Sequence, residues 1–137
     1  MREITFRGRV MDDFEELNIK KGDFVFGNLV HDGKQPYIVG DVAEVNEEYI
    51  SLEEWLPVIP KTVGQFIGRK DKNGKKIYEG DICQNGDWVS DAHAHDYRKE
   101  EVTWDEDSAC WQGWELNEDG MCCEVIGDIY ENKELLV

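Results

Sequence analysis

Metal-ligating side chains occur in close order at one place in the chain, where His93, His95 and Asp96 lie within four residues. In an extended segment, residues two apart share a face, so both imidazoles would lie on one side, where Cys83 or an acidic group could join them. Two histidines are too few, because zinc takes three or four ligands from the protein. We therefore interpret the segment 91–96 as a polar surface loop and predict no bound metal and no cofactor.

The four cysteines do not form a recognisable metal or redox motif. They are Cys83, Cys110, Cys122 and Cys123, and no two of them have the Cys-x-x-Cys spacing. If Cys122 and Cys123 lie on a strand, they point to opposite faces and cannot chelate one ion together. Without a secretory signal, an even number of cysteines does not predict disulfides, so we expect reduced thiols.

The sequence also lacks the common catalytic motifs. It contains no His-Glu-x-x-His, no phosphate-binding Walker loop and no Gly-x-Ser-x-Gly. Carboxylates are so frequent that a close pair of them would carry little information. We predict that the protein has no catalytic residues and is not an enzyme.

Opposite charges are separated along the chain. Five cations, which we call the basic tip, lie in eight residues: Arg69, Lys70, Lys72, Lys75 and Lys76. From Glu100 to Asn132 there is no Lys or Arg but there are eleven acids. These acids are Glu100, Glu101, Asp105, Glu106, Asp107, Glu115, Glu118, Asp119, Glu124, Asp128 and Glu131.

Two interpretations of this separation stay open. An acidic surface keeps a protein soluble and needs no partner. Alternatively, the basic tip of one copy meets an acidic face on another copy, or on a host protein that normally binds nucleic acid. Tryptophans are usually core residues, but an exposed indole beside others marks a contact surface. We therefore add Trp111 and Trp114, which lie near Trp88 and Trp104 in the sequence, to the basic tip as the predicted contact surface.

Length and composition limit the possible classes of protein. The chain has 137 residues, a formal net charge of −16, 40% hydrophobic and 11% aromatic residues. This fits one compact domain or two very small ones and excludes a wholly disordered chain. No run approaches the ~20 apolar residues of a membrane span, and no signal sequence is recognisable, so we expect a cytoplasmic protein. The negative charge disfavours binding to duplex DNA or to an anionic membrane.

Short apolar runs separated by turn residues predict a mainly β, antiparallel and barrel-like structure with few short helices. The clearest hairpin joins 63–68 to 76–82, because Asn73-Gly74 accepts the positive φ of a tight turn. Ser51-Leu52-Glu53-Glu54 has capping-box spacing and predicts at most a short helix or turn, and 132–137 predicts a terminal turn. We further expect a long loop from Asn85, a strand at 102–104 and a last strand at 124–130.

A weak internal similarity accompanies these elements. The segments 21–25 and 79–83 both place Gly-Asp before an apolar run, which two turns leading into two strands explain. We treat the chain as a single unit that has a possible N-terminal β part, 1–60, and a C-terminal β part, 61–137. A variable insert at 85–99 belongs to the second part.

The segment from Thr62 to Ile82, TVGQFIGRKDKNGKKIYEGDI, resembles the central signature of the YopX family of bacteriophage and prophage proteins. The opening REITFR, the run FGNL and the closing VIGDIYENKELL are also similar to that family, although the family usually has Pro where this chain has Lys133. The resemblance implies a largely β phage protein of unknown function in a bacterial host cell. It brings no catalytic residues.

Three functions of different classes follow. The first is a non-enzymatic accessory protein that acts through protein contacts, with itself as a homo-oligomer or with a host protein. The second is a small β-barrel that binds nucleic acid through the hairpin 69–76, which the net charge makes the weaker hypothesis. The third, a metal-dependent hydrolase built on His93 and His95, has the least support.

Overall fold

The computed structural model describes residues 2–89, 94–114 and 123–136. The structure is mainly β, with 54% of the described residues in strands and 9% in helical turns. The helical turns are the 3-10 helices η1 (Glu15–Leu17), η2 (Pro60–Thr62) and η3 (Lys133–Leu136). The predicted mainly β, antiparallel fold with few short helices is therefore confirmed, but no sheet of the described residues closes into a barrel.

The chain divides into two compact units, residues 1–65 and 66–137, and the division falls inside strand β7 (Gly64–Lys70). In the first unit, β1 (Phe6–Arg9) pairs with β2 (Phe24–Asp32) on one side and with Gly64 and Gln65 on the other. Strand β2 continues into β3 (Gln35–Val39), which pairs with β6 (Trp55–Pro57). All of these pairings are antiparallel.

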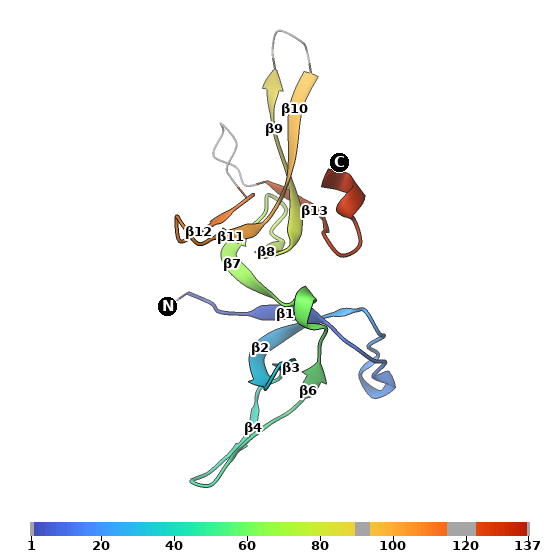
Figure 1. The fold of residues 1–137 in the computed structure, drawn as a ribbon, viewed down its shortest axis with the longest axis vertical. Coiled ribbons are helices and arrows are strands. Elements are labelled where there is room, and N and C mark those ends of the chain that lie inside the picture. Colours follow the sequence, from blue (N-terminus) through green and yellow to red (C-terminus); the bar gives the residue numbers. More distant parts are fainter. Residues whose placement is uncertain (1, 90–93, 115–122, 137) are drawn as a thin grey trace. The chain divides into compact units, whose positions relative to one another are not determined.

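Strands β4 (Val42–Val45) and β5 (Ile50–Leu52) pair only with each other. They continue the β3–β6 hairpin beyond the end of the sheet, as Figure 1 shows at β4. The expected helix or turn at Ser51–Glu54 is therefore wrong, because Ile50–Leu52 form a strand. Pairing across the strands, as between Val45 and Ile50, stabilises the strand. A helix capped by Ser51 would end after about one turn because of Pro57, so the cap stabilises it less.

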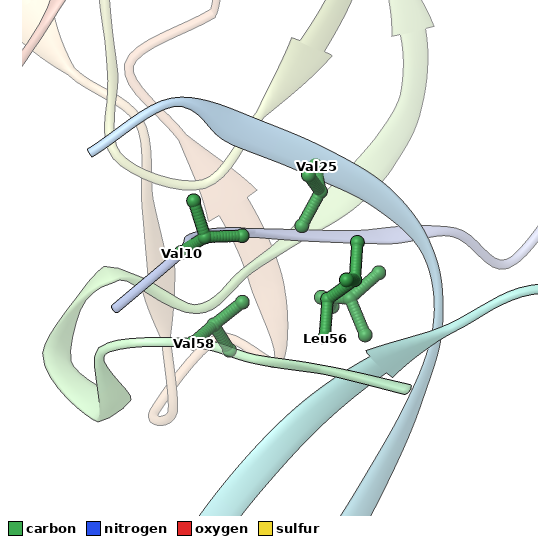
Figure 2. Close-up of a cluster of buried hydrophobic side chains, with 5 residues drawn as sticks. Val10, Val25, Leu56 and Val58 are labelled. Atoms are coloured by element: carbon green, nitrogen blue, oxygen red, sulfur yellow. The ribbon is translucent and has the colours of Figure 1, made fainter. Parts of the chain in front are cut away.

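The core of the first unit contains Val10, Val25, Ile38, Leu56 and Val58 (Figure 2). Val10 and Val58 are fully buried and form an isolated bridge between their backbones. A Cβ at Gly8 would lie 2.9 Å from Val58, so only glycine fits beside this pair. The absence of a side chain at Gly8 thus lets β1 approach Val58 closely.

The described residues of the second unit form four antiparallel strand pairings. Strand β9 (Asp81–Val89) lies between β10 (Ala94–Glu101) and β13 (Glu124–Asp128). Strand β7 pairs with β8 (Lys76–Tyr78), and β11 (Thr103–Asp105) pairs with β12 (Cys110–Gln112). The core contains Ile77, Cys83, Val102 and Cys123, against which Ile67, Trp114 and Val125 pack.

The loop expected from Asn85 is also wrong, because 81–89 and 94–101 form one long hairpin (β9 and β10 in Figure 1). Polar composition suggested a loop, yet backbone pairing is continuous from Ala94↔Val89 to Glu101↔Ile82. A strand whose faces are not both buried tolerates polar side chains, so composition alone did not identify it. The strand expected at 102–104, the last strand and the terminal turn all appear, as β11, β13 and η3.

A corner with the same hydrogen bonds leads into β2 and into β9. At the first corner, Gly22 has φ +91° and donates its N–H to the Val10 carbonyl at 3.0 Å. Val10 in turn donates to the Asp23 carbonyl at 3.0 Å, and the Asp23 carboxylate accepts the Lys20 N–H. The corner therefore fixes a fully buried valine between a glycine and an aspartate.

At the second corner, Gly80 has φ +92° and donates to the Val102 carbonyl at 2.9 Å, while Val102 donates to the Asp81 carbonyl at 2.8 Å. The Asp81 carboxylate accepts the Tyr78 N–H at 2.8 Å. Val102 follows its corner in the chain, whereas Val10 precedes its own. The weak sequence similarity of 21–25 and 79–83 thus reflects equivalent local structures, although the valine reaches them from opposite directions.

Candidate contact surface

The basic tip lies on the β7–β8 hairpin, whose turn is longer than the two-residue Asn-Gly turn that the sequence pattern predicts. Gly74 has φ +83°, but Asn73 does not have a positive φ. The Gly74 N–H donates to the Asp71 carbonyl at 3.0 Å, and the Asp71 N–H donates to the Lys75 carbonyl at 2.7 Å. The hairpin itself is confirmed, with glycine alone taking the left-handed conformation.

The Asp71 side chain organises this turn from inside. It is buried, with 6% of its surface exposed. One carboxylate oxygen accepts the N–H groups of Asn73 at 2.9 Å and Lys75 at 2.8 Å, and the other accepts the Val125 N–H at 3.0 Å. The Lys72 N–H also donates to the Cys123 carbonyl. The buried Asp71 carboxylate thus accepts backbone N–H groups from the turn and from β13, and in this way it holds the tip against the beginning of β13.

The five cations of the basic tip have different surroundings. The Arg69 guanidinium lies 5.0 Å from the centre of the Trp114 ring, and the Lys76 ammonium lies 5.3 Å from that of Phe66. Lys72 forms an ion pair with Glu124 at 3.4 Å, between side chains that are 44% and 37% exposed. An ion pair so exposed contributes little free energy, about 1 kcal/mol at most. Lys70 and Lys75 are exposed.

The tryptophans form a second feature of the same unit. Trp104 and Trp111 face each other across β11 and β12 with ring centres 4.9 Å apart and an interplanar angle of 70°. The Trp114 indole N–H donates to the Trp111 carbonyl at 2.8 Å. Trp111 and Trp114 are half-buried, whereas Trp104 is 44% exposed. Of these three indoles, Trp104 is thus the exposed one, and it packs against Trp111, one of the two predicted contact residues.

The predicted metal candidates lie largely beyond what the structure describes. His93 falls outside the described residues, and His95 and Asp96 lie on β10 opposite Trp88 and Asp87, with only their backbone described. Among the described residues, no group of three or more His, Cys, Asp or Glu side chains is arranged to hold a metal. The described part of the chain also contains no helix that is long and apolar enough to span a membrane.

Two cysteines meet in the core of the second unit. Cys83 and Cys123 are almost fully buried, Cys110 is exposed, and these three described cysteines are free thiols. A hydrogen bond to Cys123 raises the pKa of the Cys83 thiol far above its ordinary value, and burial and the nearby Asp81 and Asp71 carboxylates raise it further. At neutral pH the Cys83 thiol is therefore protonated and behaves as a small core side chain.

A second exposed surface was not predicted from the sequence. The ribbon of β4 and β5 with its flanking residues, 40–54, which we call the acidic arm, exposes apolar side chains on an unsupported strand pair. Val42 is 56%, Val45 is 64%, Tyr49 is 48% and Ile50 is 63% exposed. The sequence does contain apolar residues interspersed with acids around a turn-forming Asn46, as a hairpin requires. The capping-box spacing of Ser51–Glu54, however, predicts a short helix or turn at the position of the second strand.

Comparison with known proteins gives one family. The model of the family described as YopX protein matches residues 9–137. No curated protein and no solved structure gives a match. The matched range contains the basic tip, the acidic arm and both glycine-aspartate corners.

Proposed function

The chain belongs to the YopX family, and from this we propose that it is a non-enzymatic accessory protein of a bacteriophage or prophage that acts through protein–protein contacts, including contacts between copies of itself. Its site is a surface rather than a pocket. The basic tip supplies the cations of that surface, and acidic side chains supply the complement on the partner.

The observation that carries this proposal is the ordered presentation of cations in a chain of net charge −16. The Asp71 carboxylate accepts two N–H groups of the tip and the N–H of Val125, so the exposed Lys70 and Lys75 project from a fixed turn. A preorganised surface loses less conformational entropy on binding than a flexible one. Any second copy of so acidic a chain offers carboxylates to this turn, which favours self-association.

Nucleic-acid binding by the same hairpin is the second candidate. It is favoured by Arg69 over the Trp114 ring, because cations beside aromatic rings recognise single strands. The surrounding carboxylates oppose it, since phosphates would be repelled by most of the surface. Fluorescence anisotropy with a single-stranded oligonucleotide at low salt tests this candidate directly.

The test of self-association is the mass in solution, measured by light scattering over a range of salt concentrations. We expect a mass above that of one chain, a decrease of that mass with salt, and a monomer for the variant Lys70→Glu/Lys75→Glu. The matched control is Lys20→Glu/Lys21→Glu, which changes the net charge equally at another exposed site and should keep the wild-type mass. A wild type that is monomeric at every salt concentration would refute self-association.

A further inference from the structure

The acidic arm is an ordered element and not a frayed end. The Gly40 N–H donates to the Glu54 carbonyl at 3.0 Å and the Glu53 N–H to the Asp41 carbonyl at 2.9 Å, which continues the β3–β6 pairing outward. At its turn, the Asn46 side-chain oxygen accepts two backbone N–H groups, at 2.8 and 3.1 Å. The arm thus presents its side chains from a defined backbone.

This ordered ribbon nevertheless leaves its apolar side chains in water. All four residues of β4 are exposed, and the cross-strand pair Val45 and Ile50 has exposed fractions of 64% and 63%. A two-stranded ribbon without a supporting layer is only marginally stable in water. Adjacent exposed apolar side chains on such a ribbon are typical of a contact surface.

The charge of the arm limits what can cover it. No Lys or Arg lies between Gln35 and Pro60, and all six carboxylates of this stretch are exposed. They are Asp41, Glu44, Glu47, Glu48, Glu53 and Glu54. Phosphates of nucleic acid and anionic lipid headgroups are repelled by such a surface, and so is a second copy of the same arm. The occupant must carry positive charge and offer apolar surface to the valine and isoleucine.

We propose that the acidic arm of one copy binds the basic tip of a second copy. This inference rests on the proposed self-association and names the two surfaces that meet. The basic tip concentrates five of the fifteen cations of the chain in one turn, so it is the best complement that the chain offers. Lysine fits both needs, because its aliphatic stem covers apolar side chains while its ammonium reaches the carboxylates beside them.

The contact joins different surfaces of the two copies and is therefore heterologous. After the first contact, one copy still has an unoccupied tip and its partner an unoccupied arm, so the assembly closes into a ring or continues as a chain of copies. Exposed ion pairs contribute about 1 kcal/mol or less each, and the apolar side chains of the arm supply the rest. Association should consequently respond both to charge reversal and to loss of Val45 and Ile50.

The decisive experiment exchanges the two charges. In the first variant, Glu44→Lys/Glu47→Lys/Glu48→Lys/Glu53→Lys, the charge of the arm changes from −6 to +2. In the second, Lys70→Glu/Lys72→Glu/Lys75→Glu/Lys76→Glu, four of the five cations of the tip are replaced by acids, so the tip becomes acidic. Each variant alone pairs like charges and should be monomeric by light scattering. Mixed in equal amounts, they regain an acidic partner for every basic surface, and we expect the mixture to associate.

The outcomes separate this inference from the proposed function. An associated wild type whose mass the arm variant leaves unchanged refutes the arm contact while self-association stands. A monomeric wild type refutes both. A mixture that stays monomeric also refutes the arm contact. If the tip variant keeps a dimer that the arm variant loses, arms pair with arms and the proposed occupant is wrong.

A second pair of variants tests the apolar part of the contact. Val45→Ser/Ile50→Ser should raise the dissociation constant about tenfold or more, because the lysine stems lose the surface that they cover. The control is Ile4→Ser, which removes an apolar side chain that is 53% exposed outside the arm and should leave the dissociation constant unchanged. Equal effects of both changes would show that the arm has no special role.

Discussion

The Asp71 carboxylate accepts the backbone N–H of Val125 at 3.0 Å, although 54 residues separate them in sequence. The same carboxylate accepts two N–H groups of its own turn, so one side chain joins the β7–β8 hairpin to β13. The basic tip therefore depends on an acid inside it that the spacing of its cations does not reveal.

Replacing Asp71 by alanine should lower the free energy of unfolding by about 2–4 kcal/mol, because three backbone N–H groups lose a charged acceptor at a buried position. Asp71→Asn should recover part of the loss, since the amide oxygen still accepts. Urea denaturation followed by circular dichroism measures both. Asp32→Ala, at an exposed position of β2, is the control and should stay within about 0.5 kcal/mol of wild type.

The two corner glycines form a matched pair for substitution. Gly22→Ala and Gly80→Ala place a Cβ on nearly the same positive φ, so each should lose about 1–2 kcal/mol. Gly22 has open space around the added atom, whereas at Gly80 it would lie 3.1 Å from the Tyr130 hydroxyl. We expect the larger loss at Gly80 and a partial recovery in Gly80→Ala/Tyr130→Phe, both measured as unfolding free energies. Equal losses at the two sites would contradict the crowding by Tyr130.

The buried thiols predict a pH dependence of stability. The pKa of Cys83 is raised in the folded chain, so its contribution is fully present below the unfolded value of about 8.5 and is lost as the pH rises above it. The unfolding free energy should fall by up to about 1.4 kcal/mol for each pH unit above that value. Urea titrations in reductant at several alkaline pH values should show a shallower fall for Cys83→Ala/Cys123→Ala. Cys110→Ala, at an exposed thiol, should keep the wild-type slope.

The histidine segment gives a prediction about metal content. Purified protein should carry no stoichiometric zinc, because His93 and His95 supply too few ligands and no two cysteines have the Cys-x-x-Cys spacing. Elemental analysis after exposure to zinc and desalting provides the measurement. One zinc per chain that disappears in His93→Ala or His95→Ala would contradict this prediction.

Local rules identified some elements and failed at others for physical reasons. The hairpin at 63–82 was predictable because Gly74 is compatible with a positive φ in its turn. The long β9–β10 hairpin was not predictable in this way. Its polar composition is typical of a loop, whereas the strands form through backbone pairing, which composition alone does not reveal. Ser51 could either begin a helical turn or lie on a strand, and its pairing with Glu44 decided for the strand.

The candidate site shows the same division. The cations of the basic tip were visible from their spacing alone. The burial of Asp71, the exposure of Trp104 rather than Trp111 or Trp114, and the projection of the acidic arm all result from tertiary packing. The sequence shows which charged residues are close to each other along the chain. The burial of a side chain, in contrast, depends on elements that are remote from it in sequence.

The repeated glycine-aspartate corner also bears on how the chain acquires its structure. The first corner closes a loop between Val10 and Asp23, and the second closes one between Asp81 and Val102, both short in sequence. Short loops close quickly and lose little chain entropy, and each corner anchors a valine in or beside its own core. Folding can thus nucleate twice in one chain. Hydrogen exchange should reveal two sets of protected amides that open separately, one containing Val10 and the other Val102.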